Sequence, residues 1–125
     1  MLFKTLSFLA VATAGLTPLQ AKAASGCTLA SYYGTPQDGY GYHGDKLITA
    51  SGERFYPNGL TTAHRHFPFG TRLRVTNQRN GKSVIVRVND RGPYAGHRDL
   101  DLSYGAFSRI SNPGNGVVRV CYTTV

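Results

Sequence analysis

Half of the acidic residues in this chain lie in one short stretch, VRVNDRGPYAGHRDLDLS, at residues 86–103. They are Asp90, Asp99 and Asp101, three of six Asp and Glu residues in a chain whose formal net charge is +8. A positioned carboxyl group can protonate a leaving group or take up a proton in a reaction. Turn capping and ion pairing with nearby arginines are the competing explanations. The stretch is therefore the first candidate for a catalytic site.

Asp90 and Asp101 are the two acids with the clearest chemical potential. Asp90 follows an alternating valine run and precedes Arg91, so a strand end should hold it rigidly, as a general acid requires; a turn cap or a salt bridge to Arg91 is the alternative. Asp101 stands two residues after Asp99 in an expected strand. Both side chains should then share one face and raise each other's pKa. Alternatively, Asp101 favours the start of a following helix, and Asp99 is solvated surface.

The elements that position these residues are expected to be short strands. Fifteen glycines and six prolines, with short apolar runs between them, predict a turn-rich all-β domain. Alternating runs at 72–77 and 82–88 flank Asn80-Gly81, a strong hairpin signal. A two-residue turn there would place Val75 opposite Val86. Further strands are predicted at 28–33, 46–50, 99–102 and 117–123. A short helix should begin after Ser103 and bury Ala106, Phe107 and Ile110.

The first residues have the pattern of a secretory signal peptide. Lys4 precedes an apolar run over residues 5–16, and small residues at positions 21 and 23 predict cleavage after Ala23. Residues 24–125 would then form one domain. The apolar run is too short to span a bilayer, so the mature chain should have no transmembrane segment. We expect a monomer that is exported to the periplasm or the extracellular space.

Export also governs the interpretation of the two cysteines, Cys27 and Cys121. In an oxidising compartment they predict one disulfide that holds the first and last strands side by side. A faint lipoprotein-like sequence before Cys27 allows lipid anchoring as the less favoured alternative. Two cysteines alone make a poor metal site, and none is predicted. A basic surface attracts polyanions, but export and the lack of a recognition motif argue against nucleic acid as the partner.

Several motifs then follow one another in a recognisable order. ASYYG (30–34), TASGE (49–53), LTTAH (60–64) and PFGT (68–71) precede the hairpin, and VNDRGP (88–93) and DLS (101–103) follow it. Over roughly residues 28–110 the sequence resembles the RlpA (rare lipoprotein A) family of septal lytic transglycosylases. The resemblance implies an all-β, six-stranded double-psi β-barrel with one or two short helices, as in expansins and barwin-like proteins. It implies no cofactor.

The resemblance also implies a reaction and its partner, the glycan strands of peptidoglycan. Cleavage between N-acetylmuramic acid and N-acetylglucosamine would proceed without water, because the C6 hydroxyl of the sugar forms a 1,6-anhydro ring. The attacking group is part of the substrate, so its proximity is already provided. By the resemblance Asp90 is the acid–base residue, Glu53 and His64 assist it, and Asp101 is the alternate acid. Tyr56, Tyr94 and Arg91 are the predicted substrate-binding residues, since tyrosine rings can stack on sugars.

Tyr56 departs from the family pattern, which has an aspartate three residues after the glutamate. A tyrosine supplies a stacking face but no carboxylate, which puts turnover in question. The alternative function is therefore a non-catalytic, expansin-like module that binds cell-wall glycan. A secreted effector is a third class, because barwin-like barrels serve in that role too.

Overall fold

The computed structural model describes residues 23–37 and 48–125. The predicted signal peptide at 1–23 lies almost entirely outside the described residues. The strand predicted at 46–50 is described only from Ile48 onward, and there it is reduced to a single bridge between Ile48 and Arg54. None of the described helices is long and apolar enough to cross a membrane.

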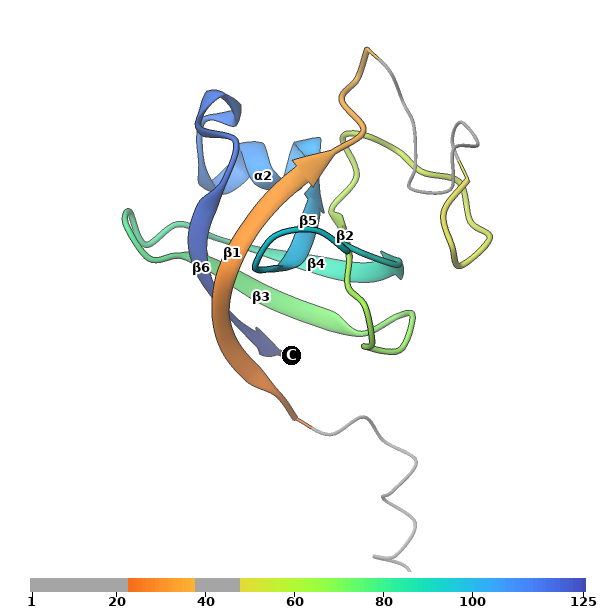
Figure 1. The fold of residues 1–125 in the computed structure, drawn as a ribbon, viewed down its shortest axis with the longest axis horizontal. Helices are drawn as coiled ribbons and strands as arrows, with labels where there is room; N and C mark the ends of the chain where they lie inside the picture. The colour runs from red at the N-terminus through yellow and green to blue at the C-terminus, as the bar shows by residue number, and fades with distance from the viewer. Residues whose placement is uncertain (1–22, 38–47) are drawn as a thin grey trace, which may run out of the picture.

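Six strands close into a barrel, which confirms the predicted fold class (Figure 1). The order around the barrel is β1-β5-β2-β4-β3-β6. The β1–β5 and β2–β4 pairs are parallel and the other pairs are antiparallel. Closure leaves no unpaired sheet edge. The strands are β1 (Ser25–Tyr33), β2 (Thr61–Ala63), β3 (Arg72–Asn77), β4 (Ser83–Asp90), β5 (Arg98–Ser103) and β6 (Val118–Thr124).

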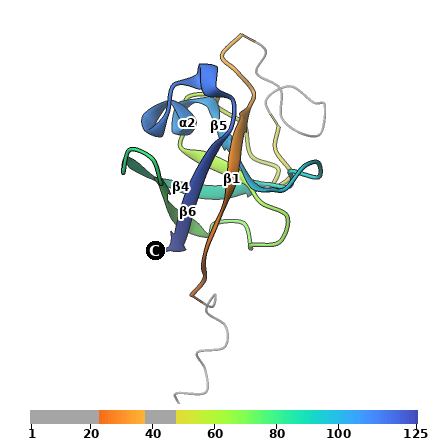
Figure 2. The same ribbon diagram turned by 60° about the vertical axis from the view of Figure 1, so that its left-hand side comes forward.

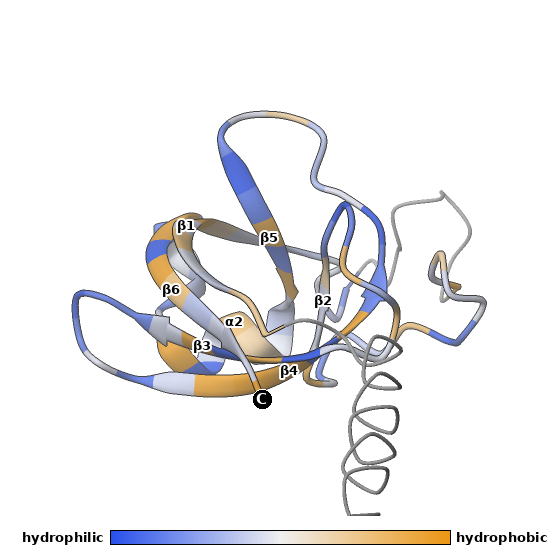
Figure 3. Ribbon diagram, turned by 90° about the horizontal axis from the view of Figure 1, so that it is seen from below, coloured by the Kyte–Doolittle hydropathy of each residue, from blue (hydrophilic) through white to orange (hydrophobic). Residues whose placement is uncertain are grey.

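Alternating apolar residues fill the barrel. On β4, Val84, Val86 and Val88 are buried, because every second side chain of a strand points to the same face. In Figure 3, β5 begins with hydrophilic residues and carries hydrophobic ones further along the strand. The core also takes up residues of β1, β3, β5 and β6, namely Ala30, Leu73, Val75, Leu100, Leu102 and Val120.

The short helix α2 (Tyr104–Ile110) packs into the core as predicted. Its buried residues are Ala106, Phe107 and Ile110. Ser103 caps it, since the Ser103 hydroxyl accepts a hydrogen bond from the Ala106 amide (3.1 Å). A 3-10 helix, η2 (Pro113–Asn115), follows. Both helices lie at one end of the barrel (Figure 1).

The first and last strands lie side by side in both views (Figures 1 and 2). Cys27 pairs with Cys121 in the β1–β6 ladder, and the two form the predicted disulfide. With both sulfurs in this bond, Cys27 has no thiol for the alternative, lipidation. The disulfide closes a loop whose ends are 94 positions apart in the sequence.

The β3–β4 hairpin forms where predicted but with a different turn. Val75 pairs with Val84, so the predicted pairing of Val75 with Val86 is wrong by two residues. The Gly81 amide donates to the Asn77 carbonyl (2.8 Å), and the loop ends at Gly81, whose φ of +76° favours glycine. A shift of two residues keeps every side chain on its face. The match of apolar faces therefore could not reveal the error.

A β-bulge in β4 turns Asp90 away from the valines that precede it. Thr62 of β2 pairs with Val88, and the next residue, Ala63, pairs with Asp90. Asn89 is therefore the extra residue. A bulge re-aims the side chains that follow it, so Asp90 shares the face of Ala63 rather than the core face of Val88.

A second bulge, in β5, overturns the predicted relation between Asp99 and Asp101. Arg98 and Leu100 pair with consecutive residues of β1, so Asp99 is the extra residue and the simple alternation fails there. Asp99 forms an ion pair with Arg65 (2.8 Å) rather than standing alone in solvent. Asp101 lies in a separate, buried environment.

Candidate active site

Two acids lie on one row of the barrel wall, with one residue between them. Ser31 of β1 pairs with Asp101 of β5, Asp101 pairs with Ala63 of β2, and Ala63 pairs with Asp90 of β4. Laterally paired residues point to the same face of a sheet, here the face opposite the core. Asp90 and Asp101 are two strand spacings apart, about 10 Å between Cα atoms. The small side chain of Ala63 lies between them.

Asp101 is a buried carboxyl group with a raised pKa. Its residue is 5% exposed, and the Ser31 hydroxyl donates to Oδ1 (2.9 Å). Burial raises the pKa of Asp101 to about 6, while the hydrogen bond from Ser31 lowers it. The predicted cause, repulsion from Asp99, is not what raises it. A carboxyl group with this pKa holds a proton under mildly acidic conditions.

Asp90 is fully buried and accepts several hydrogen bonds. The Tyr33 hydroxyl donates to Oδ2 (2.7 Å), and the Ala50 amide (2.9 Å) and the Arg91 amide (3.0 Å) donate to Oδ1. The bond from Arg91 is the turn-capping contact predicted as the alternative role. The carboxylate also joins β1 and the segment around Ala50 to the end of β4, so it is held rigidly in place.

Tyr33 hydrogen-bonds to Asp90 and lies within the electrostatic influence of Asp101. Its pKa is raised, first by burial and then by the charges of Asp90 and Asp101, with the hydrogen bond to Asp90 contributing. Its ring stacks on the buried ring of Phe55 at a centroid distance of 5.0 Å. Sequence reasoning missed Tyr33 and Ser31 as site residues. Their spacing of two in a strand that carries a family motif was the signal that could have found them.

Glu53 lies on the segment that precedes β2, and its side chain has different neighbours. It forms an ion pair with Arg87 (2.8 Å). The hydrogen bond from Arg87 lowers the pKa of Glu53, with a smaller contribution from Asn89. Asn89 is the bulge residue before Asp90, so Glu53 lies near Asp90. No contact between Glu53 and the carboxylate of Asp90 is described.

His64 is joined to Asp90 through the backbone, but its ring has other neighbours. The His64 amide donates to the Asp90 carbonyl (3.2 Å). Its Nδ1 accepts from the amides of His66 (3.0 Å) and Phe67 (2.9 Å), which places the ring proton on Nε2, and the ring stacks on Phe67. Burial lowers the pKa of His64 to about 4, and the carboxylate that opposes this shift is Asp99. His64 is therefore neutral at pH 7.

The predicted substrate-binding residues fall into two groups. Tyr56 is 61% exposed and Tyr94 is 75% exposed, so both rings are open to a ligand. Arg91, by contrast, lies 3.9 Å from the centre of the Phe69 ring and donates to the carbonyls of Phe67 (3.0 Å) and His64 (3.3 Å). These contacts give Arg91 a structural role in the turn after β2. Within the described residues, no group of three or more His, Cys, Asp and Glu is arranged to hold a metal ion.

The fold matches solved proteins of one architectural class. A Streptomyces papain inhibitor gives a TM-score of 0.62 at 22% identity, over 82% of this chain and 94% of that one. An expansin from Clavibacter michiganensis gives 0.62 at 23% identity, over 82% and 50%. Both are double-psi β-barrels, and at these identities the likeness shows the fold alone. The chain is a double-psi β-barrel protein.

The sequence comparisons identify the family of this chain. The lytic transglycolase family matches residues 25–122, and the chain belongs to this family. A probable endolytic peptidoglycan transglycosylase RlpA from Synechocystis sp. is 53% identical over 97 residues, 78% of this chain and 28% of that protein. The endolytic peptidoglycan transglycosylase RlpA of Pseudomonas aeruginosa PAO1 is 46% identical over 73% of this chain and 25% of its own length. The resemblance to RlpA is thereby confirmed. The chain spans about a quarter of the length of these relatives.

Proposed function

We propose that this protein is a lytic transglycosylase that cleaves the bond between N-acetylmuramic acid and N-acetylglucosamine in peptidoglycan glycan. The observation that carries the proposal is the row of two buried carboxyl groups, Asp90 of β4 and Asp101 of β5, on either side of β2 in a chain of the lytic transglycolase family. The relatives named as peptidoglycan transglycosylases support the choice of substrate.

The two acids are suited to different proton transfers of the reaction. Asp101, with its pKa raised to about 6, donates its proton to the glycosidic oxygen as the bond to C1 breaks. The C6 hydroxyl oxygen of the same sugar forms a bond to C1, and its proton passes to the Asp90 carboxylate. The products are a 1,6-anhydro sugar and a free hydroxyl on the departing chain, so no water is consumed. The attacking group is intramolecular, which lowers the entropic cost of the step.

Access to the acids is a condition of this mechanism. Asp90 is 0% exposed, and the Tyr33 hydroxyl bonds directly to its carboxylate. A glycan oxygen reaches Asp90 only if Tyr33 moves aside or passes the proton through its hydroxyl. Tyr33 is therefore assigned as a positioning residue that controls the proton acceptor.

A non-catalytic glycan-binding module is the second candidate function. Tyr56 and Tyr94 are widely exposed rings, and by the resemblance Tyr56 stands where an aspartate is expected. Exposed tyrosine rings bind sugars by stacking, with no carboxylate involved. Burial of Asp90 also agrees with a purely structural role for that residue. A binding module would use the exposed tyrosine rings and would need no catalysis by Asp90 or Asp101.

Product analysis separates the two functions. Purified peptidoglycan, with and without stem peptides, is incubated with the native protein and with Asp90→Asn and Asp101→Asn, and the soluble products are analysed by mass spectrometry. We expect anhydro-sugar ends from the native protein alone. Retention of the protein on the glycan without any such product would favour the binding module.

Export of the protein completes the proposal. Residues 1–23 would direct secretion and be removed after Ala23, which leaves residues 24–125 in the compartment where peptidoglycan lies. The disulfide between Cys27 and Cys121 agrees with an oxidising compartment. N-terminal sequencing of the secreted protein tests the cleavage position.

A further inference from the structure

A polar hollow of about 440 Å³ opens on the outer face of the barrel, beside the disulfide. Neither Asp90 nor Asp101 lines it. Its walls come from the first half of β1, the turn after β2, the loop before β5, the start of β5, and β6. The lining residues are Cys27, Thr28, Leu29, Arg65, Gly96, His97, Arg98, Asp99 and Arg119.

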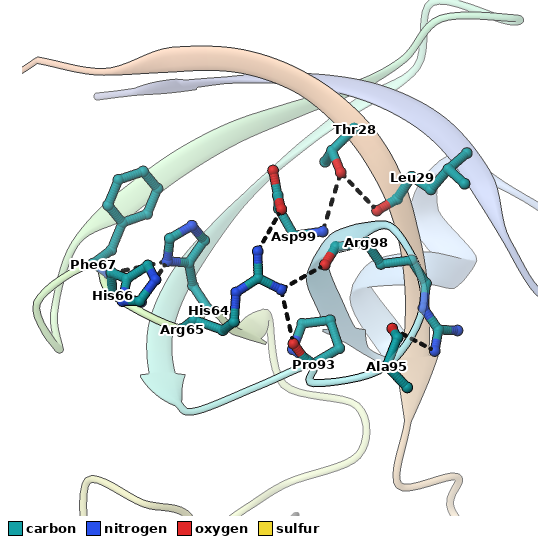
Figure 4. A network of polar contacts seen from close by, with 10 residues as sticks. All are labelled: Thr28, Leu29, His64, Arg65, His66, Phe67, Pro93, Ala95, Arg98 and Asp99. Carbon is teal, nitrogen blue, oxygen red and sulfur yellow. Dashed lines mark hydrogen bonds and ion pairs between the residues drawn. The ribbon is translucent and has the colours of Figure 1, made fainter.

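The charges in this hollow do not cancel. Arg65 is paired with Asp99 (2.8 Å), and its guanidinium also donates to the carbonyls of Pro93 (2.9 Å) and Arg98 (3.0 Å) (Figure 4). Arg98 and Arg119 form no ion pair with any carboxylate of the described residues. The hollow therefore carries two uncompensated positive charges.

The Arg98 guanidinium is held in place with donors to spare. Nη2 donates to the Ala95 carbonyl (3.3 Å), as Figure 4 shows, and the guanidinium packs over Gly96, where an added Cβ would lie 3.4 Å from Nε. Gly96 has φ +73°, a conformation that favours glycine. The Arg65 network fixes the backbone at Arg98. Nε of Arg98 is buried without a hydrogen-bond partner, so the donors that remain for a planar acceptor such as a carboxylate are those of the two terminal nitrogens that Ala95 does not take.

The hollow and the acid pair lie on the same outer face of β1. Cys27, Leu29, Ser31 and Tyr33 alternate with residues that face the core, so all four point outward. Leu29, which lines the hollow, is two residues from Ser31, about 7 Å along the strand. A glycan whose scissile bond lies at Asp101 would extend one sugar or two further to reach the hollow.

We propose that this hollow binds a carboxylate of the glycan, with Arg98 and Arg119 as the recognising residues. The inference rests on the proposed function for the identity of the polymer. N-Acetylmuramic acid differs from N-acetylglucosamine by a lactyl ether that ends in a carboxyl group. In bare glycan that carboxyl is free, and in peptide-bearing glycan the stem peptide supplies carboxylates instead. Either would distinguish peptidoglycan from an uncharged chitin chain.

Binding measurements test the inference independently of cleavage. Isothermal titration calorimetry is run on the full chain carrying Asp90→Asn, with glycan length checked by mass spectrometry afterwards. The ligands are a bare peptidoglycan hexasaccharide, the same sugar with its lactyl carboxyls amidated, the peptide-bearing form, and chitohexaose. The variants are Arg98→Gln with Arg119→Gln, and the matched pair Arg74→Gln with Arg109→Gln. The matched pair removes the same charge from exposed sites outside the hollow.

We expect the parent to bind the carboxylate-bearing sugar about tenfold more tightly than chitohexaose or the amidated sugar, since hydrogen bonds to charged groups are the strong ones. The Arg98 and Arg119 variant should lose this preference, and the matched pair should keep it. If the bare sugar binds more tightly than the peptide-bearing form, the lactyl carboxyl is the group that the hollow binds. If the peptide-bearing form binds more tightly, that group is a carboxylate of the stem peptide. If the double variant does not fold, Arg119→Gln alone replaces it in the test, because this substitution removes no described hydrogen bond.

Equal affinity of the parent for all four sugars would overturn the inference, as would equal losses in the two double variants. Failure of the parent to bind any of them would overturn the inference and the proposed function together. Carboxylate-dependent binding without anhydro products from the native protein would sustain the inference and overturn the proposed catalysis.

Discussion

Burial, and not a neighbouring residue of the sequence, raises the pKa of Asp101. The carboxyl group is nearly removed from water, so its charged form is disfavoured, and the one hydrogen bond from Ser31 only partly compensates. Asp90, by comparison, accepts from a hydroxyl and two backbone amides. The two carboxyl groups of the proposed site therefore have different hydrogen-bond partners.

Two substitutions at this site test the assignment of Asp101 as the acid. The rate of anhydro-sugar formation should fall as pH rises through about 6, because the protonated form of Asp101 is lost. Asp101→Asn should lower the rate by about 10²–10⁴-fold. Ser31→Ala removes the hydrogen bond that lowers the pKa of Asp101, so the fall in rate should move to higher pH. Rates measured between pH 4.5 and 8 on a defined glycan check both expectations.

A merely structural role for Ser31 would lower the rate equally at every pH. An unmoved pH profile in Ser31→Ala would therefore contradict the assignment, provided that thermal unfolding shows a folded variant.

At the scale of elements, one bulge and one tight contact position the site. The bulge at Asn89 moves Asp90 to the face of Asp101, and α2 fixes the segment that carries Tyr56. The Gly105 amide donates to the Pro57 carbonyl (2.8 Å). A Cβ at Gly105 would lie 2.7 Å from both the Cα and the carbonyl oxygen of Asn58, closer than real contacts allow.

Gly105→Ala should therefore destabilise the protein, although alanine is the better helix former by about 1 kcal/mol. Overpacking against backbone costs about 1–3 kcal/mol, and the clash would displace the segment at Asn58. Ser108→Ala, at an exposed position of the same helix, is the matched control and should be close to neutral. The free energy of unfolding from urea titration measures both. A stabilised Gly105→Ala would show that the helix and the Asn58 segment separate easily.

The sequence predicted elements better than it predicted their pairings. Short strands, the Ser103 cap and the Cys27–Cys121 bond could be read from local patterns, because capping, alternation and cysteine pairing have local chemical causes. The hairpin register could not, since pairing Val75 with Val84 or with Val86 leaves the same face buried. The bulges at Asn89 and Asp99 have no local signature either.

The same limit applied to the candidate site. Asp90 and Asp101 were predicted as site residues from motifs, and the barrel brings them to one row. The ring environment of His64 and the ion pair of Glu53 with Arg87 depend on contacts between distant segments. The catalytic roles predicted for Glu53 and His64 remain predictions. Tyr33 was overlooked as a site residue because its hydroxyl reaches Asp90 across 57 positions of sequence.

At the scale of the whole molecule, the disulfide links the two ends of a closed barrel. Cys27→Ser with Cys121→Ser should lower the free energy of unfolding by about 4–5 kcal/mol in the chain-entropy model, given a separation of 94 positions. The β1–β6 ladder should still close the barrel, because it extends from Ser25 to Ala30 on β1. Urea titrations with and without a reductant measure the loss. Reductant should weaken the native protein and leave the double variant unaffected, and equal midpoints for the native and double-variant proteins would contradict the expectation.

Two buried groups make opposite contributions to the pH dependence of stability. The raised pKa of Asp101, about 6, means that the folded state binds a proton that the unfolded state releases, so stability falls as pH rises from 4.5 to 6. The lowered pKa of His64, about 4, means that the unfolded state binds the extra proton, so stability increases as pH rises toward 6.5. Each group changes the free energy of unfolding by about 3 kcal/mol once its titration is complete. In the native protein the two slopes should largely cancel.

Single variants should expose each slope in turn. Asp101→Asn leaves the His64 contribution alone, so its free energy of unfolding should increase between pH 4.5 and 6.5. In His64→Asn the side-chain oxygen can still accept from the amides of His66 and Phe67. The free energy of unfolding of this variant should decrease as pH rises. The pair of variants combined should be flat again. Urea titrations at half-unit pH steps measure the slopes, and parallel curves for the two single variants would mean that burial does not shift these two groups in opposite directions.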